Sequence, residues 1–178
     1  IYAAINALGA DGAEFTVEAG RPDTFTDEKL AACKEAGVTR ICVNPQTFSD
    51  ETLARIGRRH TAEQVIDAYY MAEKYGFDIN IDLIAGLPGE DPGDFRNSLS
   101  IAVQLQPENI TVHSLCLKSG SRLKERVSRI DGGEIDEMIA LSREMLTSAG
   151  YEPYYLYRQK YQAGANENTG WCRPGKAC

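Results

Sequence analysis

Short strand-like runs alternate with helices along this chain, and this alternation constrains the fold more than any other feature of the sequence. The predicted strands cover residues 14–19, 39–46, 78–85, 109–117 and 152–158. Helices between them begin at the capping residues Thr26, Ser49, Thr61 and Asp91, and a last helix covers 135–149. Strands separated by helices form βαβ units in a parallel α/β sheet with right-handed crossovers. The segment from residue 159 to the end is rich in Gly and Asn and is predicted to be loop.

Each predicted strand has one apolar and one polar face, because successive side chains point to opposite sides of a sheet. The polar sets are Glu14, Thr16 and Glu18; Cys42, Asn44 and Gln46; Asn80 and Asp82; and Thr111 and His113. A doubly wound sheet needs two apolar faces. The polar face therefore favours a barrel or partial barrel with a ligand site at the carboxyl ends of its strands. The alternative is a polar core in which these residues satisfy one another.

Length and charge exclude several classes of protein. The chain has 178 residues, whereas a closed eight-stranded β/α barrel needs about 250. Its 26 Asp and Glu outnumber its 19 Lys and Arg, which argues against nucleic acid as a partner. It contains no apolar run long enough for a membrane span and no secretory signal, and its five cysteines are an odd number. We therefore expect a cytoplasmic protein.

The remaining local motifs are less specific. The cluster from Arg55 to His60 is the one dense basic stretch, and it either binds an anion or neutralises the end of a helix. The loop 86–90 (GLPGE) is neither a P-loop nor a dinucleotide-binding turn. His60 and His113 are the only histidines and do not by themselves predict a metal site.

Four ordered segments together resemble a known family. They are 80–90 (NIDLIAGLPGE), 16–23 (TVEAGRPD), 46–48 (QTF) with 57–60 (GRRH), and 111–115 (TVHSL). Taken in their order along the chain, they resemble radical S-adenosylmethionine (SAM) enzymes, and most closely the oxygen-independent coproporphyrinogen III oxidase (dehydrogenase) family. The run 155–160 (YLYRQK), followed by Glu167 and Asn168, resembles a bacterial branch of that family.

The resemblance implies a fold and a set of SAM-binding residues. It implies that residues 1–125 form a partial β/α barrel of the radical SAM type, covering roughly its third to sixth strands. Residues 126–178 would be a C-terminal helix and the start of the family's C-terminal region. By the same resemblance, SAM contacts Glu18, Gln46, Arg58, Asp82 and, through its backbone, Cys116. The family more often has Gly-Val where Asn44-Pro45 precede Gln46.

The family's cluster ligands are absent from this sequence. The family binds a [4Fe–4S] cluster through a C-x-x-x-C-x-x-C loop after its first strand, and no such spacing occurs here. A Gly-Gly segment that contacts SAM is also missing. The chain opens at Ile1 in a helix-like segment and stops at Cys178, so we expect an internal fragment that is inactive alone.

In the parent protein, the resemblance implies oxidative decarboxylation of coproporphyrinogen III to protoporphyrinogen IX in haem biosynthesis. An electron donor would reduce the cluster, and SAM would be cleaved to a 5′-deoxyadenosyl radical. That radical would abstract hydrogen from a propionate side chain, and loss of CO₂ would leave a vinyl group.

Three alternatives remain open from the sequence. A paralogue of the same family would handle haem or act on another substrate. A metal-independent β/α lyase or isomerase would use Glu18, Asp82 and His113 as acid and base groups. A non-catalytic binding module would keep only the barrel.

Overall fold

The computed structural model describes residues 14–116, 132–158 and 166–178. Six strands form one sheet in the order β1-β2-β3-β4-β6-β5. The strands are β1 (Thr16–Gly20), β2 (Arg40–Gln46), β3 (Asp78–Ala85), β4 (Asn109–Ser114), β5 (Glu152–Tyr157) and β6 (Asn168–Cys172). The helices are η1 (Pro22–Thr24), α2 (Asp27–Glu35), α3 (Asp50–Arg55), α4 (Ala62–Lys74), α5 (Pro92–Leu105) and α7 (Gly132–Ser148).

Strands β1 to β4 are parallel and are joined by helices, as the alternation predicts. The predicted caps are present: Thr26 and Ser49 each accept a hydrogen bond from the first turn of their helices. Thr61 and Asp91 each form a reciprocal capping box that satisfies two backbone donors. Local sequence therefore defines where these helices begin.

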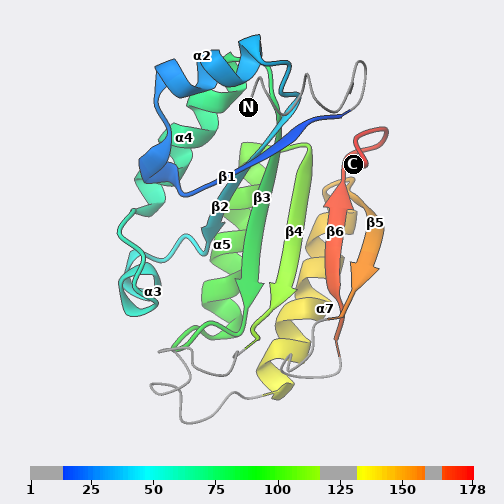
Figure 1. Ribbon diagram of the computed structural model, residues 1–178. Coiled ribbons are helices and arrows are strands. Elements are labelled where there is room, and N and C mark those ends of the chain that lie inside the picture. The colour runs from blue at the N-terminus through cyan, green and yellow to red at the C-terminus, as the bar shows by residue number, and fades with distance from the viewer. Residues whose placement is uncertain (1–13, 117–131, 159–165) are drawn as a thin grey trace.

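The helices pack against the apolar face of the sheet. In Figure 1, α5 and α7 lie behind β3, β4 and β6, and the near side of these strands carries no described helix. The side chains between the layers come from alternate strand positions and are fully buried, among them Ile41, Val43, Ile81, Leu83 and Ile110. The opposite face is polar. This is the arrangement of a partial β/α barrel, in which the polar face forms the concave interior.

The prediction that the chain is loop beyond residue 159 is wrong. Residues 168–172 form β6, which lies antiparallel between β4 and β5. Asn168 is fully buried, and its side-chain oxygen accepts a hydrogen bond of 2.8 Å from the backbone N–H of Ser114. β6 thus pairs with the free side of β4, and β5 joins the sheet through β6 instead of pairing directly with β4.

The strict alternation predicted for β2 is also wrong at its carboxyl end. The register with β3 passes from Val43↔Ile81 to Gln46↔Leu83, so three residue steps on β2 oppose two on β3. Such a bulge re-aims the side chains that follow it. Gln46 has a φ of 74°, in the left-handed region that residues other than glycine seldom adopt. The face assigned to Gln46 by counting from Cys42 therefore does not hold.

Candidate functional site

A polar cavity of about 300 Å³ lies on the concave face of the sheet. It is lined by residues of five strands and by the chain end: Thr16, Glu18, Arg40, Cys42, Asn80, Asp82, Thr111, His113, Tyr154, Tyr155, Tyr157 and Cys178. Except for Arg40, every lining residue from the first four strands was assigned to the polar face by alternation. The sequence pattern thus predicts most of the lining, whereas the tyrosines of β5 were not predicted to lie there.

A chain of hydrogen bonds crosses the cavity floor from β1 to β4. Glu18 accepts from the Cys42 thiol at 3.1 Å. Burial, reinforced by Glu18, raises the pKa of Cys42, so this thiol stays protonated and remains a donor. Asn80 donates to Asp82 Oδ1 at 2.7 Å and accepts from the Thr111 hydroxyl at 3.1 Å. The two carboxylates are therefore held in fixed positions by polar neighbours.

Asp82 also faces a histidine that is bonded to a tyrosine. His113 Nε2 lies 3.7 Å from Asp82 Oδ2, and both side chains are about one-fifth exposed. The other ring nitrogen, Nδ1, lies 2.8 Å from the Tyr157 hydroxyl. Asp82, His113 and Tyr157 thus form a carboxylate–imidazole–phenol array that spans β3, β4 and β5. The sequence identified the first two as candidates and missed the third.

Tyr155 reaches the cavity because it crosses a glycine. Tyr155 is paired with Gly170 on β6, and Gly170 is paired with Thr111 on β4. Its ring fills the space that a Cβ at Gly170 would need, and its hydroxyl lies 3.4 Å from the Thr111 hydroxyl. The rings of Tyr155 and Tyr157 stack at an interplanar angle of 20°. Their i, i+2 spacing was the only sequence signal that they share a face.

Arg40 closes the end of the cavity at the start of the strands. Its side chain is almost fully buried, bonds to Glu14 and to the side-chain oxygen of Asn109, and lies 3.7 Å from an Asp78 oxygen. Burial opposes the charge of Arg40, but its hydrogen bond with Glu14 and the nearby negative charges, including Asp78, outweigh that effect and raise its pKa. Alternation with Cys42 could have identified Arg40 as part of the polar face. Its charge is committed to these partners.

The other residues that the resemblance implies for SAM come after β2 or β4 along the chain or at the last residue of β2, and none of them lines the cavity. Gln46 ends β2 at the bulge, and half-buried Arg58 lies in the loop between α3 and α4. Cys116 is half-buried and lies two residues beyond β4. The structure therefore brings Glu18 and Asp82 into one cavity, whose lining does not include Gln46, Arg58 or Cys116.

The residues of the basic cluster from Arg55 to His60 differ in what they contact. Arg55 bonds to Glu51 on its own helix and donates to the Pro88 carbonyl at 2.7 Å, which holds the loop after β3. His60 is almost fully buried, and burial lowers its pKa. Arg55 thus serves the helix end and the loop, whereas Arg58 keeps the anion-binding interpretation.

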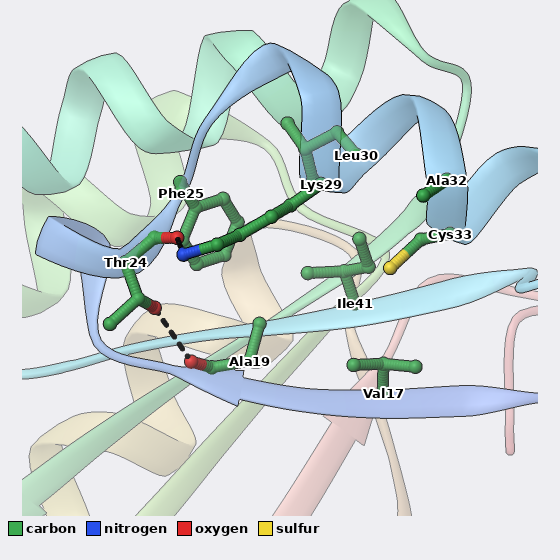
Figure 2. Close-up of a pocket in the computed structure, with 9 residues that line it drawn as sticks. All are labelled: Val17, Ala19, Thr24, Phe25, Lys29, Leu30, Ala32, Cys33 and Ile41. Carbon is green, nitrogen blue, oxygen red and sulfur yellow. Dashed lines mark hydrogen bonds between the residues drawn. The ribbon is translucent and has the colours of Figure 1, made fainter. Parts of the chain in front are cut away.

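A second cavity, of about 280 Å³, lies on the apolar side of the sheet between β1, β2 and α2. Figure 2 shows Val17, Ile41 and Cys33 turned towards one another across it, with Lys29 donating to the Thr24 carbonyl at its edge. Most of its lining residues are aliphatic or aromatic. It therefore belongs to the packing of helix on sheet and holds none of the candidate site residues.

The described ranges contain no group of three His, Cys, Asp or Glu side chains that could hold a metal ion. Among the helices in these ranges, none is long and apolar enough to cross a membrane.

Comparisons with known proteins agree on one superfamily. The sequence profile of the Radical SAM superfamily matches residues 1–102. The oxygen-independent coproporphyrinogen-III oxidase-like protein HemZ of Bacillus subtilis is 45% identical over 167 residues, covering 92% of this chain and 33% of that protein. The haem chaperone HemW of Mycobacterium tuberculosis H37Rv is 32% identical, covering 95% of this chain and 42% of that protein. The chain thus spans well under half the length of these relatives.

The fold agrees with the same group. The structure of the coproporphyrinogen III oxidase HemN from Escherichia coli, a radical SAM enzyme, superposes with a TM-score of 0.76. The superposition covers 98% of this chain and 41% of that chain at 22% sequence identity. At this identity the likeness concerns the fold alone, and it confirms the partial barrel.

Proposed function

This chain belongs to the radical SAM superfamily, and on that premise we propose that it forms the SAM-binding part of a protein that acts on tetrapyrroles. The observation that carries the proposal is the polar cavity that joins Glu18 on β1 to Asp82 on β3. Both the coproporphyrinogen oxidase-like relative and the haem chaperone relatives are named for tetrapyrrole chemistry. The boundary between residues 1–125 and 126–178 remains part of the proposal, because it lies outside the described residues.

The residues of the cavity fit SAM. SAM carries a sulfonium and an ammonium group, and two carboxylates lining one cavity favour a ligand with positive charge. Carboxylate oxygens also accept hydrogen bonds from ribose hydroxyls or from the amino group. Arg58, in the loop after α3, supplies a guanidinium suited to the SAM carboxylate. In this proposal Glu18, Asp82 and Arg58 bind and orient SAM. Gln46, at the end of β2, and Cys116, after β4, are the remaining proposed contacts.

The cluster does not fit the residues of this chain. Its five cysteines lie at 33, 42, 116, 172 and 178, without the three-cysteine spacing, and Cys42 is committed to Glu18. When SAM is bound to a reduced [4Fe–4S] cluster, it supplies a 5′-deoxyadenosyl radical for hydrogen abstraction. We propose that the cluster ligands belong to a longer protein and that this chain provides the concave wall that holds SAM and excludes water.

For the substrate, the proposed reaction is oxidative decarboxylation of coproporphyrinogen III. A second candidate, haem handling, is supported by the likeness to the haem chaperone HemW of Mycobacterium tuberculosis H37Rv, which is 32% identical and covers 95% of this chain. Anaerobic assay of the longer protein for vinyl products separates the two functions.

The SAM site is tested by Asp82→Ala in the longer protein. Loss of a charged hydrogen-bonding group is expected to weaken SAM binding about 10-fold to 100-fold, measured by calorimetry. Asp67→Ala removes the same charge from an exposed position on α4 and should leave the affinity unchanged. Equal affinities of Asp82→Ala and the unmodified protein would reject the proposed site.

A further inference from the structure

The two oxygens of the Asp82 carboxylate are each faced by a different side-chain nitrogen. Asn80 donates to Oδ1 at 2.7 Å, and His113 Nε2 lies 3.7 Å from Oδ2. The other ring nitrogen of His113, Nδ1, lies 2.8 Å from the Tyr157 hydroxyl. The SAM-binding role proposed for Asp82 does not by itself account for this imidazole and this phenol.

Asp82 and Tyr157 together favour one tautomer of His113. A neutral imidazole has one N–H donor and one acceptor nitrogen. With the proton on Nδ1, the lone pair of Nε2 would face the carboxylate, and two acceptors would oppose each other across 3.7 Å. With the proton on Nε2, an N–H group faces the carboxylate, and Nδ1 accepts from the phenol at 2.8 Å. Only the second tautomer suits both neighbours of the ring.

The position of Tyr157 is itself set by packing. Its ring stacks on that of Tyr155 at 20°, with centroids 5.9 Å apart, and meets the His113 ring edge to face at 71°. Tyr155 lies over Gly170, and its hydroxyl is 3.4 Å from the Thr111 hydroxyl. These contacts hold the phenol beside Nδ1, so the hydrogen bond costs less side-chain entropy than one made by an unsupported tyrosine.

The Tyr157–His113 pair lies outside the part of the chain that the radical SAM profile matches. The profile covers residues 1–102, which include Glu18 and Asp82, whereas His113 is on β4 and Tyr157 is on β5. β5 joins the sheet through β6, which pairs with β4. The pair is therefore a feature of the C-terminal part of this chain, and it faces a carboxylate that belongs to the part matched by the profile.

We propose that Tyr157 is a positioning residue of the SAM site, which holds His113 with its Nε2–H towards Asp82 and so fixes the orientation of that carboxylate. The inference rests on the proposed SAM-binding function. Neither residue needs to touch SAM, because Tyr157 acts through His113 and His113 acts through Asp82. A carboxylate restrained at both oxygens loses less rotational freedom when SAM binds, so its contact contributes more to affinity.

The test is a double-mutant cycle on SAM affinity in the longer protein, measured by calorimetry. Tyr157→Phe removes only the hydroxyl and should weaken SAM binding about 3-fold to 10-fold, as expected for loss of one hydrogen bond. In an Asp82→Ala background the same change should have no further effect, because the group that it positions is absent. A merely structural role would weaken both backgrounds equally. Tyr70→Phe removes an exposed phenol on α4 and should leave the affinity unchanged.

A second measurement needs no SAM and reads the tautomer directly. The chain has only two histidines, so isotopic labelling of the histidine nitrogens gives two imidazole rings to follow by nuclear magnetic resonance. At alkaline pH we expect the proton of His113 on Nε2 and an Nδ1 chemical shift that marks an accepted hydrogen bond. Tyr157→Phe should remove the hydrogen-bond effect at Nδ1, and His113→Gln identifies the signals of this ring.

Three results would overturn the inference. They are a proton on Nδ1 of His113 in the unmodified chain, unchanged SAM affinity in Tyr157→Phe, and equal weakening by Tyr157→Phe with and without the Asp82 carboxylate. The first requires no variant, so it does not depend on whether Tyr157→Phe folds. If the unmodified longer protein binds SAM, any of these results rejects this inference alone. If it does not bind SAM, the proposed function is rejected and the inference with it.

Discussion

At the scale of single residues, Gly170 allows the ring of Tyr155 to lie across β6 at the edge of the cavity. A Cβ at this position would overlap the ring of Tyr155, which lies across β6 to reach Thr111. A larger residue would force the ring away or strain the strand, and overpacking of this kind costs about 1–3 kcal/mol. Gly170 is thus needed for close approach of a side chain, not for an unusual backbone angle.

Gly170→Ala is therefore expected to lower the free energy of unfolding by about 1–3 kcal/mol, measured by urea denaturation. The double variant with Tyr155→Ala should recover part of that loss, because the ring is then absent. Gly132→Ala, where no atom lies within 4 Å of the added Cβ, is the control. Equal loss in the single and double variants would show that the ring is not the cause.

At the scale of elements, Glu90 ties two strand-end loops to a helix. It is buried in the loop after β3 and accepts from Thr47 at 2.5 Å, in the loop after β2. Thr47 lies 3.1 Å from Ser98 on α5, whose hydroxyl also accepts from the backbone of Phe48. These contacts fix the backbone that follows Gln46, at the end of the bulged strand. The carboxyl ends of β2 and β3 are therefore one coupled unit.

Burial raises the pKa of Glu90, and its hydrogen bond from Thr47 only partly opposes this shift. The folded protein thus retains a proton that the unfolded chain releases as pH rises above the ordinary value for Glu. Stability is therefore lost as pH rises through the raised folded pKa. Relative to Glu90→Gln, the unmodified chain should become less stable between acidic and neutral pH in urea unfolding. Glu63→Gln, exposed on α4, should show no such trend. A pH-independent difference for Glu90→Gln would contradict the account.

At the scale of the whole molecule, the sheet has two open edges within the described residues. β1 pairs only with β2 and β5 only with β6, and β5 carries Leu156, which is 60% exposed. Unpaired strand edges with apolar side chains promote association between chains.

We expect the isolated chain to self-associate with rising concentration in sedimentation velocity experiments. Leu156→Lys should shift the distribution towards monomer, because a charge on an edge strand opposes pairing. Tyr70→Lys places the same charge at an exposed site on α4 and should have no effect. A single monomer boundary from the unmodified chain at every concentration would reject this prediction.

The sequence predicted the elements wherever the determining interactions are local. Capping residues such as Thr61 and Asp91 bond to backbone groups three residues away, so their effect can be read without the fold. Alternation along β1, β3 and β4 likewise assigned Glu18, Asp82 and His113 to one face. These features need only the periodicity of regular structure.

The bulge at Gln46, the position of β6 and the Tyr157–His113 pair were decided by the tertiary structure alone. A bulge depends on the register of a neighbouring strand, and β6 is a short strand fixed by the free side of β4 and the Asn168 side chain. Tyr157 and His113 are 44 residues apart and meet because β6 pairs with both β4 and β5 in one sheet. The polar face could thus be predicted from the sequence, because side-chain alternation is local. The tyrosines of β5 at the end of the cavity could not be predicted, because their position depends on pairing between strands that are distant in the sequence.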